Sequence, residues 1–253
     1  MLAFFAPVFH YVKIKQQLCT QRTYLTNLIK FTMKTKLIAA IAVLTLATGI
    51  QASAQQKDWA QLGRYAQANK EAAPSPKAVF MGDSITDGWD DADQPFFTDN
   101  GFICRGISGQ TTSEMLVRFR QDVIGLHPKY VVILAGTNDI AMNNGFIALE
   151  NVLGNLISMC ELAKANRIRP ILCSVTPSAG FGWRPEIKDA ASRIEKLNGM
   201  IKAYAESKKI PYVDYHSALK DENGGLPATY SGDGVHPNLD CYKIMEKIIL
   251  EYL

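Results

Sequence analysis

Acidic residues are absent from the N-terminal part of this 253-residue chain, where no Asp or Glu precedes Asp58. Six basic residues lie within residues 1–54: Lys13, Lys15, Arg22, Lys30, Lys34 and Lys36. Setting these six aside leaves 21 of the 27 Lys and Arg against 24 Asp and Glu, so the formal charge changes from +3 to −3. The remaining domain is slightly acidic, and we expect no nucleic-acid partner.

The chain also lacks a hydrophobic run long enough to span a bilayer, which takes about 20 apolar residues. Its most apolar run, 37–50, follows Lys34 and Lys36 and precedes Ala52-Ser53-Ala54, the small-residue pattern of a signal-peptidase site. We therefore expect 33–54 to be a signal peptide and 55–253 to be the working domain. For residues 1–32 we favour an overlong start assignment over an unusual extended leader.

The same pattern predicts export to the periplasm or secretion, with no stable membrane insertion after cleavage. An uncleaved anchor is the less favoured alternative. No Cys follows the apolar run closely, so we expect no lipid-anchored lipoprotein.

Metal and cofactor motifs are missing as well. There is no CxxC spacing, no Cys/His cluster, no Walker pattern and no G-x-G-x-x-G, so we expect no metal and no organic cofactor. An even set of cysteines follows the leader and leaves one or two disulfides open: Cys104, Cys160, Cys173 and Cys241. Their apolar neighbours favour buried free thiols instead.

Strand-like and helix-like segments alternate along the rest of the chain. The short apolar runs are 78–81, 102–105, 130–134, 170–175 and 211–213, and the longer helical patterns are 58–70, 112–126, 146–166, 185–208 and 239–253. This order predicts one α/β domain, a three-layer sandwich around a parallel sheet of about five strands. Function in such sheets collects beyond the carboxyl ends of the strands.

Polar or glycine-rich segments follow the first three predicted strands. Ser84 comes after the first, Gly109 lies in the glycine turn after the second, and Asn138 follows the third. Taken alone, Ser84 is as easily a helix cap as a nucleophile, because Ser is a favoured N-cap. Glycine at 109 would let a substrate approach the backbone closely.

Three histidines follow the leader. His127 precedes the third strand at the wrong end of the sheet, and His216 is a rival base that more simply begins a short helix. His236 has Asp233 three residues before it, so Asp233 can accept from Nδ1 while Nε2 faces outwards.

The order Gly82-Asp83-Ser84, Gly109, Gly136-Thr137-Asn138-Asp139 and Asp233-Gly234-Val235-His236 resembles the GDSL-type or SGNH hydrolases, which include lipases and esterases. The resemblance covers 78–253, with Ile85 in place of the Leu of the family's name. It implies a flavodoxin-like sandwich and a serine carboxylic-ester hydrolase. Its implied catalytic triad is Ser84, Asp233 and His236, and its implied oxyanion hole is Ser84, Gly109 and Asn138.

The segment after the fourth strand, 178–185, offers substrate contacts from Phe181, Trp183 and Arg184. We expect either an aromatic wall over the site or a surface loop with its aromatics packed down. Our first expectation for the substrate is a short acyl ester, an acetyl group on carbohydrate. The alternatives are a lysophospholipase, thioesterase or platelet-activating-factor-acetylhydrolase-like activity, and a non-catalytic glycan-binding member or a cofactor binder.

Overall fold

The computed structural model describes residues 22, 25, 26, 28, 30–36 and 58–253. It divides into two compact units, Met1–Lys57 and Asp58–Leu253. In the first unit, residues 30–36 are helical. The predicted apolar run of the signal peptide and its cleavage site lie outside the described residues. Within the described part, no helix combines the length and apolar character that crossing a membrane requires.

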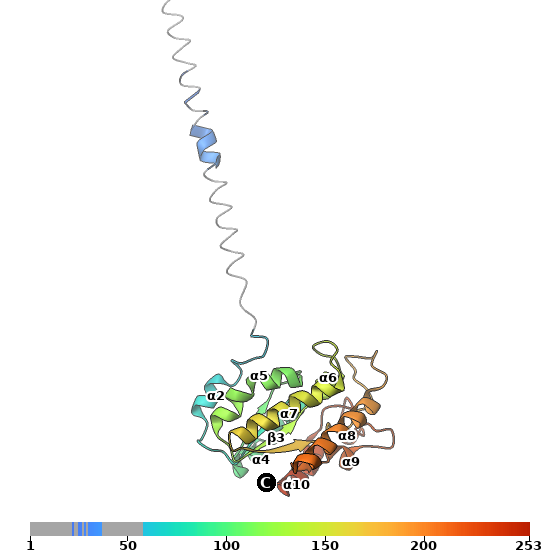
Figure 1. Cartoon of the computed structure of the whole chain (residues 1–253). Coiled ribbons are helices and arrows are strands. Elements are labelled where there is room, and N and C mark those ends of the chain that lie inside the picture. Colours follow the sequence, from blue (N-terminus) through green and yellow to red (C-terminus); the bar gives the residue numbers. More distant parts are fainter. Residues whose placement is uncertain (1–21, 23–24, 27, 29, 37–57) are drawn as a thin grey trace, which may run out of the picture. The chain divides into compact units, whose positions relative to one another are not determined.

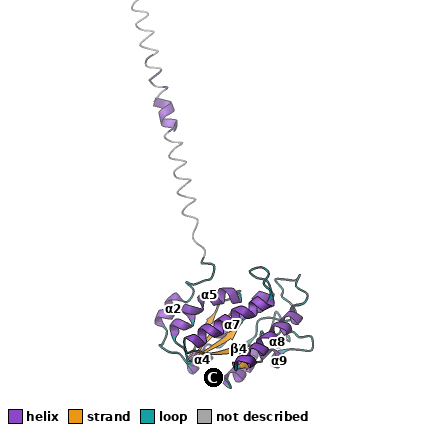
Figure 2. Ribbon diagram, in the orientation of Figure 1, coloured by secondary structure: helices purple, strands orange, loops and turns teal. Residues whose placement is uncertain are grey.

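The second unit is built on five parallel strands in the order β2-β1-β3-β4-β5. The strands are β1 (Ala78–Gly82), β2 (Phe102–Gly106), β3 (Tyr130–Leu134), β4 (Arg169–Cys173) and β5 (Tyr212–Val213). Figure 2 shows them enclosed by helices. The predicted parallel sheet and three-layer class are therefore confirmed, and all five strands lie where the apolar runs placed them.

The helices are α2 (Ala66–Glu71), α3 (Ser84–Ala92), α4 (Gln94–Asn100), α5 (Thr112–Asp122), η1 (Ile124–Leu126), α6 (Thr137–Ile140), α7 (Leu149–Ala165), α8 (Ala190–Lys208), α9 (Tyr215–Leu219) and α10 (Leu239–Leu250). The predicted lead helix 58–70 is wrong in its first half. Asp58 Oδ1 and Oδ2 accept the backbone N–H groups of Leu62 and Gly63 at 2.9 and 2.7 Å, closing a turn where helix was expected.

Alternate residues of each strand face opposite helical layers, as the period of two in a strand requires. Val79 and Met81 of β1 point into a core formed with α5, α7 and α8, while Ala78 and Phe80 point into a second core. Figure 1 shows α7 crossing the sheet between α5 and α8. The second core packs α3, α4, α9 and α10 around Trp89, which is 1% exposed.

The four cysteines of the second unit are free and buried: Cys104, Cys160, Cys173 and Cys241. The disulfides left open by the sequence are thus not formed, and the expectation of buried thiols holds. Burial raises the pKa of the Cys104 and Cys160 thiols to about 12, which makes both of them weak nucleophiles at neutral pH.

Candidate active site

Ser84 stands at the first position of α3, directly beyond the carboxyl end of β1. The N-cap of that helix is Asp83, whose Oδ1 accepts the backbone N–H of Ile85 at 3.0 Å. Because Asp83 performs the capping, the Ser84 hydroxyl is not needed for it. Ser84 is half-buried, so its Oγ is both held and accessible.

His236 lies against Ser84, although 152 residues separate them in the chain. Its Nε2 is 2.9 Å from Ser84 Oγ, and its Nδ1 is 2.6 Å from Asp233 Oδ2. A carboxylate only accepts hydrogen bonds, so Nδ1 carries the proton and Nε2 is left to accept from the serine hydroxyl. The structure thus brings Ser84, His236 and Asp233 together in the geometry of a nucleophile, its base and the carboxylate that orients the base.

The Asp233 carboxylate is fixed by more than the imidazole. Its Oδ1 accepts the backbone N–H groups of Val235 and His236 at 2.9 and 2.8 Å and the Ser231 hydroxyl at 3.1 Å. Partial burial acts to raise the pKa of Asp233, but hydrogen bonds from the His236 and Val235 backbone and the His236 ring outweigh it and hold the pKa well below its usual value. Ser231, which the sequence did not single out, therefore helps to keep this carboxylate charged and in place.

Gly109 lies in the loop after β2, and Asn138 lies in α6, the short helix that follows β3. Gly109 has φ +81°, a left-handed backbone that side chains rarely adopt, and a Cβ built on it would meet nothing within 4 Å. The open space around this residue leaves room for a ligand to approach its backbone. Asn138 is 3% exposed, and its Nδ2 donates to the backbone oxygen of Gln110 at 3.1 Å.

Further hydrogen bonds join these loops at the carboxyl edge of the sheet. Asp139 accepts from the Thr112 backbone N–H at 2.9 Å and from its hydroxyl at 2.6 Å. Ser108 Oγ donates to Asp87 Oδ2 at 2.8 Å, so the glycine turn is also tied to α3. Ser84 at the start of α3, Gly109 in its loop and Asn138 in α6 thus follow β1, β2 and β3 at one edge of the sheet. Hydrogen bonds between their neighbours connect them.

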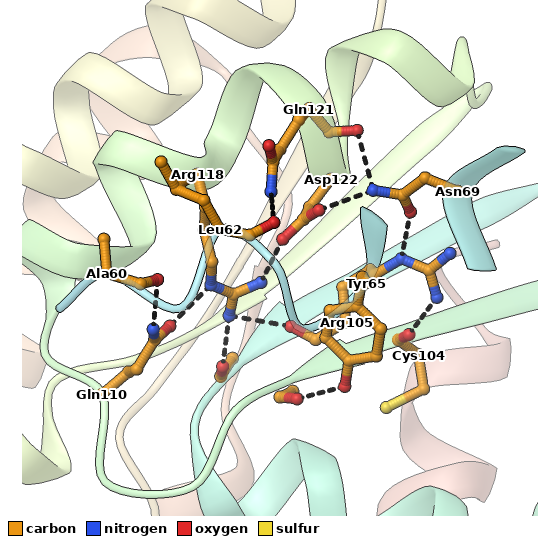
Figure 3. Close-up of polar contacts among 12 residues, drawn as sticks. Ala60, Leu62, Tyr65, Asn69, Cys104, Arg105, Gln110, Arg118, Gln121 and Asp122 are labelled. Carbon is orange, nitrogen blue, oxygen red and sulfur yellow. Dashed lines mark hydrogen bonds and ion pairs between the residues drawn. The ribbon is translucent and has the colours of Figure 1, made fainter. Parts of the chain in front are cut away.

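A buried arginine supports the same loops from behind. Arg118 of α5 is fully buried, and its Nη2 donates to the backbone oxygens of Gly82 and Arg105 at 3.0 and 2.9 Å. Its Nε donates to Gln110 Oε1 at 2.6 Å, and its Nη1 pairs with buried Asp122 at 3.1 Å. Figure 3 shows the guanidinium between these partners. Arg118 therefore joins the ends of β1 and β2 to the loop that carries Gly109.

This arginine is not among the residues predicted from the sequence. The available signal was a charged pair, Arg118 and Asp122, spaced i,i+4 on the helix face that also carries Met115 and Phe119. Charges on an apolar helix face are buried only when they are paired, so such a pair marks a structural anchor.

Two buried carboxyls flank the site with raised pKa values. Burial raises the pKa of Asp83 to about 7, against the lowering effects of the Ile85 backbone and His236. Burial likewise raises the pKa of Asp139 to about 6, against the hydrogen bonds from Thr112. Neither group lies between Ser84 and His236 in the hydrogen-bonded chain, and Asp83 Oδ2 has no hydrogen-bond partner within residues 58–253.

The three predicted substrate contacts in loop 178–185 differ in their exposure and in their neighbours. Phe181 is 3% exposed and belongs to the core, so its place in an open aromatic wall was wrong: the apolar ring packs down. Trp183 is 43% exposed, with its ring centroid 6.2 Å from that of His236. Arg184 donates to the Met142 backbone oxygen at 3.2 Å and lies 3.7 Å from Glu186, and its contact with an anionic substrate stays a prediction.

The other histidines lie elsewhere. His216 is 5% exposed on α9, where its backbone N–H donates to Ser174 Oγ at 2.8 Å. Burial, aided by Lys220, lowers the pKa of its imidazole. His127 ends η1 before β3, at the opposite end of the strand from Asn138. Among the described residues, no three His, Cys, Asp or Glu side chains gather as a metal site.

Comparison with known proteins assigns this arrangement to a family. Residues 80–244 match the GDSL-like Lipase/Acylhydrolase family. The structure of a GDSL-like lipase from Bacteroides thetaiotaomicron is similar, with a TM-score of 0.75 and 49% identity, covering 77% of this chain and 98% of that chain.

Two sequence relatives are more distant. The acetylxylan esterase of Geobacillus stearothermophilus is 25% identical over 157 residues, 58% of this chain and 69% of the esterase. An uncharacterized lipoprotein of Bacillus subtilis is 36% identical over 75 residues, 28% of this chain, and the match spans 31% of that lipoprotein.

Proposed function

This chain belongs to the GDSL-like lipase/acylhydrolase family and is a carboxylic-ester hydrolase, and on that premise we propose that it is an exported enzyme that removes acetyl groups from carbohydrate. The observation that carries the catalytic part is the line of contacts from Ser84 Oγ to His236 Nε2 at 2.9 Å and from His236 Nδ1 to Asp233 at 2.6 Å.

In the first half of the proposed reaction, His236 Nε2 takes the hydroxyl proton as Ser84 Oγ bonds to the ester carbonyl carbon. Asp233 stabilises the imidazolium that forms, and its lowered pKa keeps it charged while it does so. The tetrahedral intermediate then breaks its bond to the alcohol oxygen, which receives the proton from Nε2. Alcohol leaves, and the acyl group stays on Ser84 as an ester.

The second half repeats these steps with water. His236 Nε2 takes a proton from the water molecule as its oxygen bonds to the acyl carbon. The bond to Ser84 Oγ then breaks, and the proton on Nε2 returns to Oγ while the carboxylic acid leaves. In both halves the oxyanion is proposed to accept from the Ser84 and Gly109 N–H groups and from Asn138 Nδ2.

The position of Trp183 supports the proposal that the alcohol part of the ester is a carbohydrate. Because His236 must protonate the departing alcohol, groups beside its ring flank the alcohol rather than the acyl chain. The ring centroid of Trp183 lies 6.2 Å from that of His236, and 43% of the Trp183 surface is exposed. The indole therefore offers a flat apolar face on which a sugar ring can stack. A relative that is an acetylxylan esterase is consistent with this choice.

The test compares Ser84→Ala with the native chain on p-nitrophenyl esters from acetate to decanoate and on acetylated xylan. Ser84→Ala should abolish turnover, whereas Ser207→Ala, a serine-to-alanine change at an exposed position of α8, should retain it. Acetate release from xylan and a preference for acetate support the proposal. A preference for decanoate would instead indicate a lipase or lysophospholipase, and full activity of a folded Ser84→Ala protein would contradict the proposed nucleophile.

The export part has a separate test. Expression from Met33 in a bacterial host should place the mature protein outside the cytoplasm, with its N-terminus at Gln55 by mass spectrometry. Retention of residues 33–54 in the cytoplasmic fraction would contradict the predicted signal peptide.

A further inference from the structure

A line of hydrogen bonds runs from the exposed Trp183 to the buried Asn138 through a second asparagine, Asn143. Trp183 Nε1 donates to Asn143 Oδ1 at 2.9 Å, and Asn143 Nδ2 donates to Asn138 Oδ1 at 2.6 Å. Asn138 Nδ2 in turn donates to the backbone oxygen of Gln110 at 3.1 Å. We call these three side chains and the Gln110 carbonyl the amide relay.

The hydrogen bond at each end of the amide relay has only one possible direction from donor to acceptor. A backbone carbonyl such as that of Gln110 can only accept, so the atom of Asn138 that faces it must be the nitrogen. An indole nitrogen can only donate, so the atom of Asn143 that faces Trp183 must be the oxygen. The two ends therefore agree on the orientation of both amides, and Asn143 is left to present its NH₂ group to the Asn138 oxygen.

Asn143 stands outside the regular elements, between α6 and α7. Its backbone N–H donates to the Asn138 backbone oxygen at 3.0 Å, and its Nδ2 also lies 3.5 Å from the Gly109 carbonyl. The preceding Met142 has φ +53°, and its carbonyl accepts from Arg184. The segment is thus held against Gly109 and Asn138, two of the three proposed oxyanion donors, and against loop 178–185.

We propose that Asn143 is a positioning residue that orients the Asn138 amide and couples the oxyanion hole to Trp183. This inference rests on the proposed function, because it assigns Asn138 Nδ2 to the oxyanion. One hydrogen of that NH₂ group is directed at Gln110, and the second is the one available to substrate. Substrate contact with Trp183 would affect the Asn143 amide through the Nε1 hydrogen bond. Through Asn143 it would affect Asn138 Nδ2, the proposed donor to the oxyanion.

The decisive variant is Asn143→Asp, which keeps the shape and changes only the donor. A carboxylate can still accept from Trp183, but it turns an acceptor oxygen toward the Asn138 oxygen. The Asn138 amide then loses one of the two partners that fix its orientation and keeps only the Gln110 carbonyl, and two oxygens repel each other. We expect kcat to fall by about tenfold to a hundredfold, less than removal of a whole oxyanion donor, with little change in KM.

The pH profile separates positioning from a general structural role. Protonation of the introduced carboxyl restores a donor toward Asn138, and proximity to an acceptor oxygen favours the protonated form. The ratio of the kcat of Asn143→Asp to that of the native chain should therefore rise as the pH falls from 8 toward 5. Asn143→Leu cannot regain a donor, so its lowered kcat ratio should not change with pH.

The matched control is Asn144→Asp, which introduces the same charge one residue along. Asn144 is exposed, and its side chain has one contact, 3.5 Å from Thr111 Oγ1, so kcat and its pH profile should stay as in the native chain. Trp183→Phe removes the indole N–H and keeps a ring. It should lower kcat severalfold, and it tests the amide relay even if the Asn143 variants fail to fold.

Native kcat in Asn143→Asp, or a kcat ratio that does not change with pH, would overturn the inference. A Ser84→Ala protein that still turns over would instead refute the proposed function, so the two failures are distinguishable.

Discussion

Asp83 caps the helix that begins at Ser84, the proposed nucleophile, by accepting the Ile85 N–H at 3.0 Å. This contact excludes one of the two roles that the sequence left open for Ser84, since the serine is helical but does not cap. It also places a carboxyl that is 1% exposed one residue from the Ser84 hydroxyl, and burial raises the pKa of this carboxyl to about 7.

The raised pKa of Asp83 predicts a pH-dependent stability. The folded state holds the Asp83 proton up to about pH 7, whereas the unfolded chain releases it near its ordinary pKa of 3.8. The stabilising effect is therefore fully present at low pH and is lost as the pH rises through the folded-state pKa. Asp83→Asn stays neutral and retains an oxygen for the Ile85 N–H.

Thermal unfolding of both proteins from pH 4 to 8 measures this effect. The stability of Asp83→Asn relative to the native chain should increase by a few kcal/mol across that range. A constant difference in Tm would show that the Asp83 carboxyl has the same pKa in both states.

Removal of the Asn138 side-chain donor should lower kcat. Asn138→Ala deletes one proposed contact to the oxyanion, so we expect kcat to fall on the order of 10²–10³-fold with KM changed far less. Steady-state kinetics on p-nitrophenyl acetate measure this, with Asn144→Ala as an exposed control. A change confined to KM would assign Asn138 to ground-state binding instead.

Asp233→Asn tests the orientation of the imidazole. The amide oxygen can still accept the Val235 and His236 backbone N–H groups, which preserves the loop. An NH₂ group facing Nδ1 selects the tautomer that has its proton on Nε2, where it cannot accept from Ser84. We expect kcat to fall on the order of 10³–10⁴-fold, measured with active-site titration by a fluorophosphonate. Near-native turnover would mean that another group orients His236.

Arg118→Met should destabilise the fold because it leaves the buried Asp122 carboxylate without its ion-pair partner and with the Asn69 Nδ2 hydrogen bond alone. Both side chains are fully buried in the native structure. We expect a loss of about 3–5 kcal/mol in the free energy of unfolding, measured in urea. The double variant Arg118→Met/Asp122→Leu should recover part of that loss, since it removes the uncompensated charge. Equal losses in the single and double variants would indicate that the hydrogen bonds to Gly82 and Arg105 dominate.

The positions of the strands along the chain were readable because buried parallel strands are continuous apolar runs, a local property of the sequence. Helix boundaries were less accurate. The helices α7 and α8 begin three and five residues later than predicted, at Leu149 and Ala190, and neither has a side-chain cap at its start. In the predicted lead helix, the Asp58 side chain competes for the backbone and closes a turn with Leu62 and Gly63. Such competition depends on rotamers and backbone angles that periodicity does not encode.

By itself, the sequence determined the α/β class, the five strands and the four motifs at the carboxyl edge of the sheet. Only the tertiary structure decided which histidine meets Ser84, that Phe181 is buried while Trp183 is exposed, and that Arg118 and Asn143 support the proposed oxyanion loops. The physical reason is distance along the chain. A strand or a motif is specified by neighbouring residues, whereas the contact from Ser84 to His236 joins residues 152 positions apart and exists only once the sheet has aligned its loops.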